Sequence, residues 1–235
     1  MGVKFCGLIE PMPPSFYQMR QCESPECGLR YPLTEGHPFG ERCPLCLGPT
    51  RVELQKPLDT EPFTDGPSTT TQPLEALLDN VRSAWNVGAI FRTADAFGVL
   101  RLHLCGITPT PENASVAKTA LGADKTIPWT ASKNALTTAR ELKINGAQLW
   151  ALEQDRRAVS LYDLPLSDLR HLSQSTNLPI TNLPIILIVG NEITGVDPAL
   201  LDLCDQIVYI PMRGHKRSLN VEVAFGVAAY TMQKA

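Results

Sequence analysis

The chain lacks several features that would assign it to a class at once. No apolar run approaches the roughly 20 residues that a helix needs to span a bilayer, and residues 1–14 contain no apolar core typical of a secretory signal. Aromatic residues make up only 6% of the chain, and the net charge of −3 gives no overall basic surplus. These absences predict a cytoplasmic protein in which any surface that binds nucleic acid is local.

The chain also lacks an even set of cysteines, and this argues against a disulfide framework. Of its seven cysteines, four fall between residues 22 and 46, as pairs separated by four and by two residues. Two tight turns that each carry two thiolates supply the tetrahedral ligands of zinc, which are here Cys22, Cys27, Cys43 and Cys46. We therefore predict a structural zinc site, with a redox pair or incidental cysteines as the alternative.

Composition divides the chain into three parts. Residues 1–56 hold the clustered cysteines and many prolines but no helical periodicity, which predicts a small zinc-ribbon-like domain. Residues 57–73 are rich in Pro, Thr, Asp and Gly and read as a linker. Residues 74–235 alternate short apolar runs with helical patterns, which predicts an α/β domain with a parallel sheet covered by helices on both faces. No internal repeat is evident.

The elements of the large domain follow from its apolar runs and helical patterns. Expected strands are residues 74–78, 100–104, 148–152, 184–189 and 207–210. Expected helices are residues 87–97, 115–121, 132–144, 198–204 and 220–232. Residues 153–183 contain prolines and several Ser and Asn residues, so we expect a long excursion there with at most one helical turn.

Three segments carry polar residues after these expected strands, where open α/β sheets bind ligands. Residues 79–98 lead into a helix that carries Arg92. The alternative to a functional role for Arg92 is a surface ion pair with Asp95. Residues 189–197 form a glycine-bounded loop that fits neither a Walker A loop nor a dinucleotide fingerprint. Residues 210–224 pass through a basic loop before the last helix, and that loop is either a phosphate-binding patch or simply solvated.

In this order and spacing the three segments resemble the three motifs of the SpoU (TrmH-like) branch of the SPOUT RNA methyltransferases. The residues that carry the resemblance are Asn86, Gly88, Arg92, Phe97 and Gly98 in the first segment, Gly190, Asn191, Glu192 and Gly195 in the second, and Ile210, Pro211, Met212, Gly214, Ser218, Leu219, Asn220 and Val221 in the third. The resemblance implies methyl transfer from S-adenosylmethionine to a ribose 2′-hydroxyl of tRNA or rRNA. It also implies a C-terminal trefoil knot and a homodimer, neither of which periodicity predicts.

The resemblance also assigns roles to residues. The catalytic set is Arg92, Asn86, Glu192, Ser218 and Asn220, with Arg92 stabilising the developing alkoxide and the others orienting Arg92 and the ribose. The cofactor set is Ile188, Gly190, Asn191, Ile210, Met212, Ser218 and Leu219, mainly through backbone groups. The set that contacts RNA phosphate is Arg213, His215, Lys216 and Arg217.

Two questions stay open at this level. A non-catalytic RNA-binding or assembly factor that kept the fold is the rival to an enzyme, and the zinc-ribbon-like domain is suited to docking RNA, DNA or protein.

The chain also departs from the family pattern at Glu222, where many members have a small residue after Asn-Val. That carboxylate is expected either to tune substrate choice or to pair with the basic loop.

Overall fold

The computed structural model describes residues 15–36, 41–58, 73–163 and 183–233. The chain divides into two compact units, Met1–Ser68 and Thr69–Ala235. The predicted linker lies almost entirely outside the described residues, as do Cys6, His37 and most of the predicted excursion before residue 183. None of the helices within the described ranges is long and apolar enough to cross a membrane.

The first unit is a three-stranded antiparallel sheet. Strand β1 (Phe16–Cys22) lies between β2 (Arg30–Thr34) and β3 (Thr50–Pro57). Among the described residues of this unit, only Arg20, Cys22 and Cys43 are buried. A sheet with so few buried side chains cannot be held by apolar burial alone, because a small domain already buries too little surface for independent stability.

The second unit is a seven-stranded sheet in the order β6-β5-β4-β9-β7-β10-β8, and every strand pair in it is parallel. Its strands are β4 (Leu74–Asp79), β5 (Leu102–Cys105), β6 (Trp129–Ser132), β7 (Gln148–Leu152), β8 (Val159–Ser160), β9 (Ile185–Val189) and β10 (Gln206–Tyr209). Strand β9 is buried along its whole length at the centre, as its β-branched run predicts.

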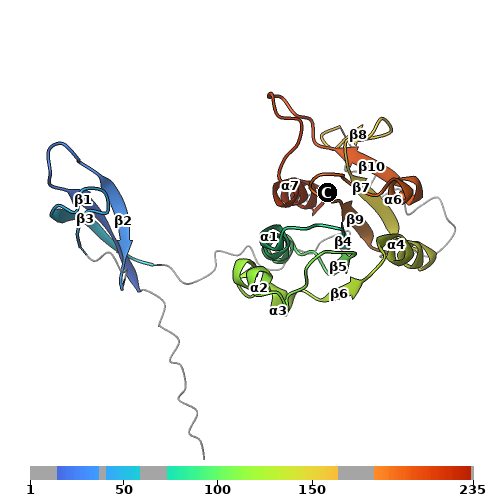
Figure 1. Cartoon of the computed structure of the whole chain (residues 1–235), viewed down its shortest axis with the longest axis horizontal. Helices are drawn as coiled ribbons and strands as arrows, with labels where there is room; N and C mark the ends of the chain where they lie inside the picture. The colour runs from blue at the N-terminus through green and yellow to red at the C-terminus, as the bar shows by residue number, and fades with distance from the viewer. Residues whose placement is uncertain (1–14, 37–40, 59–72, 164–182, 234–235) are drawn as a thin grey trace, which may run out of the picture. The chain divides into compact units, whose positions relative to one another are not determined.

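Helices cover both faces of this sheet (Figure 1). One core joins the sheet to α1 (Ala84–Ala96), α2 (Ala114–Ala120), α3 (Ala123–Thr126) and α7 (Val221–Gln233). The other core joins the opposite face to α4 (Ala135–Ile144) and α6 (Pro198–Leu203). The predicted α/β class with a parallel sheet covered on both faces is therefore confirmed.

Some element boundaries differ from the prediction. Helix α4 begins at Ala135 rather than at residue 132, because Asn134 caps it by accepting a hydrogen bond from the Thr137 N–H. The residues just before it form the edge strand β6, which the apolar pattern does not predict. Strand β8 lies at the other edge, within the predicted excursion. Both edge strands are short and partly exposed, so they lack a buried apolar run.

Candidate functional site

The polar segments meet at one edge of the sheet because all its strands run in the same direction. The loops after β9 and β10, the start of α1 and the loop after β7 enclose a hollow of about 440 Å³. Its walls contain nine of the predicted site residues: Asn86, Gly190, Asn191, Glu192, Ile210, Met212, Ser218, Leu219 and Asn220. Three stretches far apart in the sequence therefore contribute to one site.

Glu192 connects the loop after β9 to the start of α1. Its carboxylate accepts hydrogen bonds from the backbone N–H groups of Arg82 (3.0 Å) and Ser83 (2.9 Å) and from the side-chain amide of Asn86 (3.1 Å). Desolvation raises the pKa of Glu192, but these donors outweigh it and hold the pKa below its ordinary value. Glu192 is thus an ionised acceptor at neutral pH, and its arrangement suits positioning rather than proton abstraction.

Asn86 is also hydrogen-bonded to the third segment. Its side-chain oxygen accepts a hydrogen bond from the Asn220 amide at 3.1 Å, while the Asn220 oxygen accepts the Glu222 N–H at 2.8 Å. The chain Glu192–Asn86–Asn220 therefore links all three segments through side chains. Ser218 and Leu219 lie beside it in the hollow wall.

Gly190 sets the shape of the loop after β9. Asn191 and Gly195 exchange two backbone hydrogen bonds of 3.0 and 2.9 Å, which fold the loop back against Gly190. A Cβ atom on Gly190 would lie only 2.2 Å from backbone atoms of Gly195 and Val196. Only glycine allows this approach, because the obstructing atoms are backbone and cannot rotate away.

The motif resemblance implies that the hollow binds S-adenosylmethionine; if it does, Gly190→Ala should abolish that binding, because the loop has to open to admit the methyl group. Titration calorimetry with S-adenosylmethionine measures this as loss of detectable heat. The matched control is Gly214→Ala, since a Cβ atom there meets nothing within 4 Å. Equal affinity of the wild type and Gly190→Ala would contradict the assignment of this loop to the site.

Arg92 is the predicted catalytic residue that this structure does not bring to the hollow. It is exposed on α1 and is absent from the walls of the hollow. Among the described residues its guanidinium has no hydrogen-bond or ion-pair partner, so the alternative of an ion pair with Asp95 is wrong. Asp95 instead accepts a hydrogen bond from the Thr126 hydroxyl at 2.9 Å.

Gly88, another residue of the first motif, faces α2. A Cβ atom at this position would collide with the Val116 carbonyl at 2.4 Å and the Thr119 hydroxyl at 1.8 Å, both on α2. The glycine therefore permits close packing of α1 against α2.

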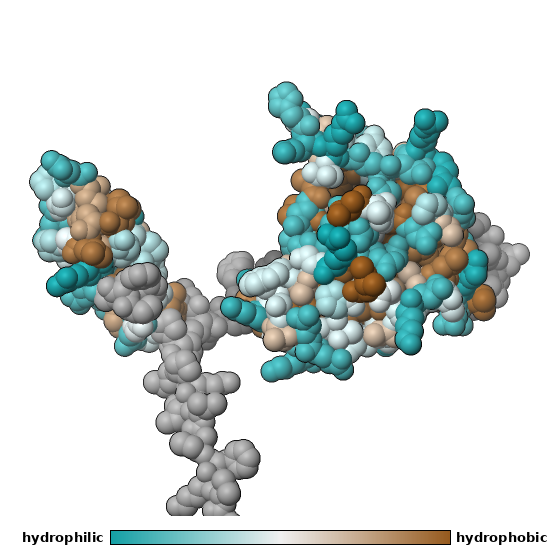
Figure 2. All heavy atoms as spheres, in the orientation of Figure 1, coloured by the Kyte–Doolittle hydropathy of each residue, from teal (hydrophilic) through white to brown (hydrophobic). Residues whose placement is uncertain are grey.

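The remaining predicted residues lie outside the walls of the hollow. Ile188 is fully buried inside β9, one residue before the hollow begins at Val189. Lys216 and Arg217 line a second hollow, and Arg213 lines a third, beside α7. His215 is exposed on the same loop, whose hydrophilic tip projects in Figure 2. The basic residues thus surround the site without forming its wall.

The loop after β7 also contributes to the site, although no sequence motif predicts it. Glu153 lines the hollow and accepts the Val196 N–H at 3.0 Å, and Gln154 lines it and donates to the Arg217 carbonyl. The family resemblance does not predict this loop, because none of the three motifs includes it. Its position at the carboxyl end of a predicted buried strand was the signal that could have identified it.

Glu222 has a definite partner, although not the basic loop. The Thr93 hydroxyl on α1 donates a hydrogen bond to its carboxylate at 3.0 Å. This bond and the hydrogen bond between Asn220 and Asn86 connect the start of α7 to α1 at two points. The expectation that Glu222 pairs with the basic loop is therefore wrong.

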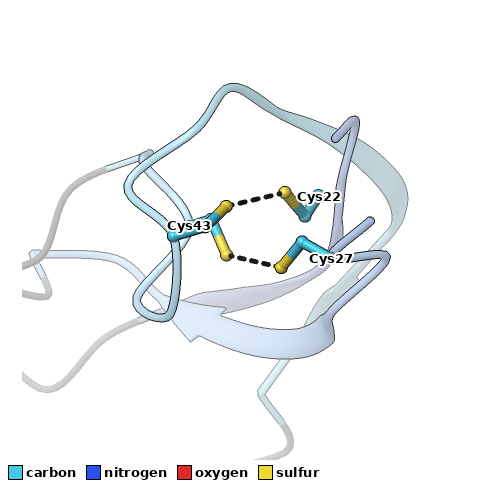
Figure 3. A group of neighbouring side chains, drawn as sticks. Cys22, Cys27 and Cys43 are labelled. Carbon is cyan, nitrogen blue, oxygen red and sulfur yellow. Dashed lines mark hydrogen bonds between the residues drawn. The ribbon is translucent and has the colours of Figure 1, made fainter. Parts of the chain in front are cut away.

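The four clustered cysteines of the first unit converge at one point, and Figure 3 labels three of them, Cys22, Cys27 and Cys43. Their Sγ atoms all lie within 4.8 Å of one another, with Cys22–Cys46 at 3.4 Å and Cys27–Cys43 at 3.7 Å. Four sulfurs at about 2.3 Å from one zinc ion lie about 3.8 Å apart, so the cluster fits a tetrahedral ion. All four cysteines are free of disulfides.

Comparison with known proteins identifies relatives of the second unit. The sequence profile of the SpoU rRNA Methylase family matches residues 73–230. The 23S rRNA (guanosine-2′-O-)-methyltransferase RlmB of Vibrio parahaemolyticus is 30% identical over 181 residues, which cover 77% of this chain and 66% of that protein. The tRNA (guanosine(18)-2′-O)-methyltransferase of Aquifex aeolicus is 30% identical over 156 residues, which are 66% of each chain.

Solved structures of RNA methyltransferases also superpose on this chain. An AdoMet-bound rRNA methyltransferase from Sinorhizobium meliloti superposes with a TM-score of 0.59 and 25% identity, covering 69% of this chain and 56% of that one. The A. aeolicus TrmH/SpoU tRNA-modifying enzyme superposes with a TM-score of 0.56 and 29% identity, covering 69% and 75%. The chain spans 66% of the length of the Vibrio parahaemolyticus relative and 56% of the length of the RlmB relative from Neisseria meningitidis.

Proposed function

The chain belongs to the SpoU rRNA Methylase family, and on that premise we propose that it transfers a methyl group from S-adenosylmethionine to a ribose 2′-hydroxyl of RNA. Relatives named for both 23S rRNA and tRNA match it at similar identity, so either RNA is a suitable substrate class. The observation that carries the proposal is the side-chain connection of Glu192, Asn86 and Asn220 across the walls of one hollow.

The hollow suits the proposed cofactor in chemistry as well as in place. S-adenosylmethionine carries a positive sulfonium, and the carboxylates of Glu192 and Glu153 both line the hollow. Backbone groups of the loops after β9 and β10 are available to the adenosyl group, with Leu152 and Ile210 as apolar wall. Gly190, Asn191, Met212, Ser218 and Leu219 complete the proposed cofactor set, with Ile188 supporting it from the core.

The catalytic problem is the weak nucleophilicity of a ribose hydroxyl. A guanidinium is a poor base in water, so the proposed role of Arg92 is to stabilise the developing alkoxide. Asn86, Glu192, Ser218 and Asn220 orient the ribose and hold the segments that carry them. Arg213, His215, Lys216 and Arg217 are proposed to contact RNA phosphates.

The cysteine cluster supports a structural zinc ion in the first unit. Cys22, Cys27, Cys43 and Cys46 occupy all four ligand positions, which leaves none open for chemistry. We propose the division into a ribbon at 1–56, a linker at 57–73 and a methyltransferase domain at 74–235, with the ribbon helping to select RNA. An enzyme that modifies RNA works where its substrate is, which supports a cytoplasmic location.

A homodimer and a C-terminal knot complete the proposal. The loop after β10 contacts the loop after β7 through Gln154 and Arg217 and shares the hollow with the loop after β9, a crowding that suits a knotted chain. On α7, Val223, Val227 and Tyr230 recur at helical spacing and are 45%, 41% and 54% exposed. An apolar stripe of this kind suits burial against a second copy.

We expect Val227→Asp to shift the protein from dimer to monomer, because a carboxylate in an apolar interface is costly to desolvate. Sedimentation velocity measures the change. The control is Ile144→Asp, which replaces an even more exposed apolar residue on α4. A wild-type protein that sediments as a monomer at micromolar concentration would contradict the dimer.

Calorimetry with S-adenosylmethionine separates the proposed enzyme from its rival. We expect one binding site per chain, together with methyl transfer to RNA. Cofactor binding without transfer to rRNA or tRNA would favour a non-catalytic RNA-binding or assembly factor. Failure to bind the cofactor at all would remove the enzymatic interpretation.

A further inference from the structure

A second hollow of about 520 Å³ adjoins the proposed cofactor site. The two hollows share Gln154, Tyr209, Ile210 and Met212 in their walls. The second hollow is formed by the loop after β7 and the loop after β10, so it lies on the same edge of the sheet. A ligand that occupies it is therefore next to the proposed methyl donor.

The charged groups of this second hollow are predominantly cationic. Arg156 comes from the loop after β7, whereas Lys216 and Arg217 come from the loop after β10. The side chains of all three are exposed and have no hydrogen-bond or ion-pair partner in the part of the chain that the structure describes. Three cations from two separate loops thus face one space without a bonded anion.

The single acid in the wall, Asp155, attracts Arg156 electrostatically but is hydrogen-bonded to Arg157 and to none of the three cations. Asp155 accepts hydrogen bonds from the Arg157 side chain at 2.8 and 3.3 Å, and this pairing holds the pKa of Asp155 below its usual value. Arg157 also binds Asp202 at 2.7 Å. Arg157 is therefore occupied in bracing the loop, while its neighbour Arg156 remains available to a ligand.

We propose that Arg156, with Lys216 and Arg217, binds a backbone phosphate of the substrate RNA beside the target ribose. This inference rests on the proposed function and adds Arg156, which lies outside the family's motifs. A phosphate suits the site because unpaired cations on separate loops can approach its oxygens from different sides. The amide of Gln154, which donates to the Arg217 carbonyl, holds the two loops together.

The test measures RNA and cofactor binding separately on the full chain. For Arg156→Ala we expect the Kd for a fluorescent single-stranded RNA oligonucleotide to rise about five-fold, which is the scale of one exposed ionic contact. We also expect the slope of log K against log salt to fall by about 0.7, the contribution of one phosphate contact on a single strand. The calorimetric Kd for S-adenosylmethionine should stay unchanged.

Two further variants identify the cause. Arg156→Lys keeps the charge and should recover most of the RNA affinity, whereas Arg140→Ala removes an exposed arginine on α4 and should change neither constant. The proposal is overturned if Arg156→Ala matches Arg140→Ala, or if it weakens cofactor binding and leaves RNA binding intact, because the hollow then serves the cofactor carboxylate. Failure of the proposed function appears separately, as a wild type that transfers no methyl group.

Discussion

Replacement of Arg92 by alanine is expected to lower kcat for methyl transfer by about 10²–10³-fold, the usual effect of removing one preorganised group that stabilises developing charge. The Kd for S-adenosylmethionine should stay near the wild-type value, because Arg92 is absent from the walls of the hollow. The melting temperature should not fall, since this exposed guanidinium has no partner among the described residues and alanine favours a helix. Single-turnover kinetics, calorimetry and thermal unfolding provide these three readouts.

The position of Arg92 outside the hollow makes the expected loss of methyl transfer a stringent test of its proposed role. Because Arg92 does not line the hollow, substrate RNA or a second copy of the chain has to bring the ribose to the guanidinium. Arg140→Ala is the control because it removes another exposed arginine, from helix α4. A variant Arg92→Ala that methylates RNA at the wild-type rate would eliminate Arg92 as a catalytic residue.

Loss of the zinc ligands should have the second largest effect, confined to the first unit. The double variant Cys43→Ser/Cys46→Ser is expected to lose about one zinc ion per chain and to unfold the three-stranded sheet of the first unit, because zinc binding supplies about 10–16 kcal/mol in small zinc domains. The structure explains this dependence, since the only buried side chains described in that unit are two cysteines and an arginine. Elemental analysis and limited proteolysis measure the two effects.

Cys204→Ala is the matched control for the cysteine variants. Burial raises the pKa of the Cys204 thiol to about 12, so it is an unreactive side chain outside the cluster. This variant should keep its zinc. Wild-type protein that is purified without chelators, contains no metal and still resists proteolysis in the ribbon would contradict the zinc assignment.

Much of the fold is predictable from periodicity, and the exceptions have physical causes. The run at residues 184–189 predicts the central strand β9 because a strand buried on both faces is continuously apolar. The apolar pattern does not predict the edge strands β6 and β8, because residues such as Thr130 and Val159 remain exposed there. Helix α4 begins three residues later than the pattern predicts, because Asn134 caps it.

The site is predictable in part, for a different reason. Motif resemblance identifies Asn86, Glu192 and Asn220, and the structure connects them by hydrogen bonds. The motif resemblance does not identify Glu153 or Arg156. Both residues lie in the loop after β7, which contributes to these hollows by its position at the carboxyl end of that strand rather than by any motif. Sequence likewise cannot reveal that Glu222 binds Thr93 across two helices that are far apart in the chain.

The most direct test of the central claim is the identity of the methylated product. Purified protein is incubated with isotopically labelled S-adenosylmethionine and with rRNA or tRNA from cells that lack the protein, and the RNA is digested to nucleosides for mass spectrometry. We predict label in a 2′-O-methylated nucleoside, and its loss with Arg92→Ala. Label found only on a base, or no transfer to either RNA, would contradict the account.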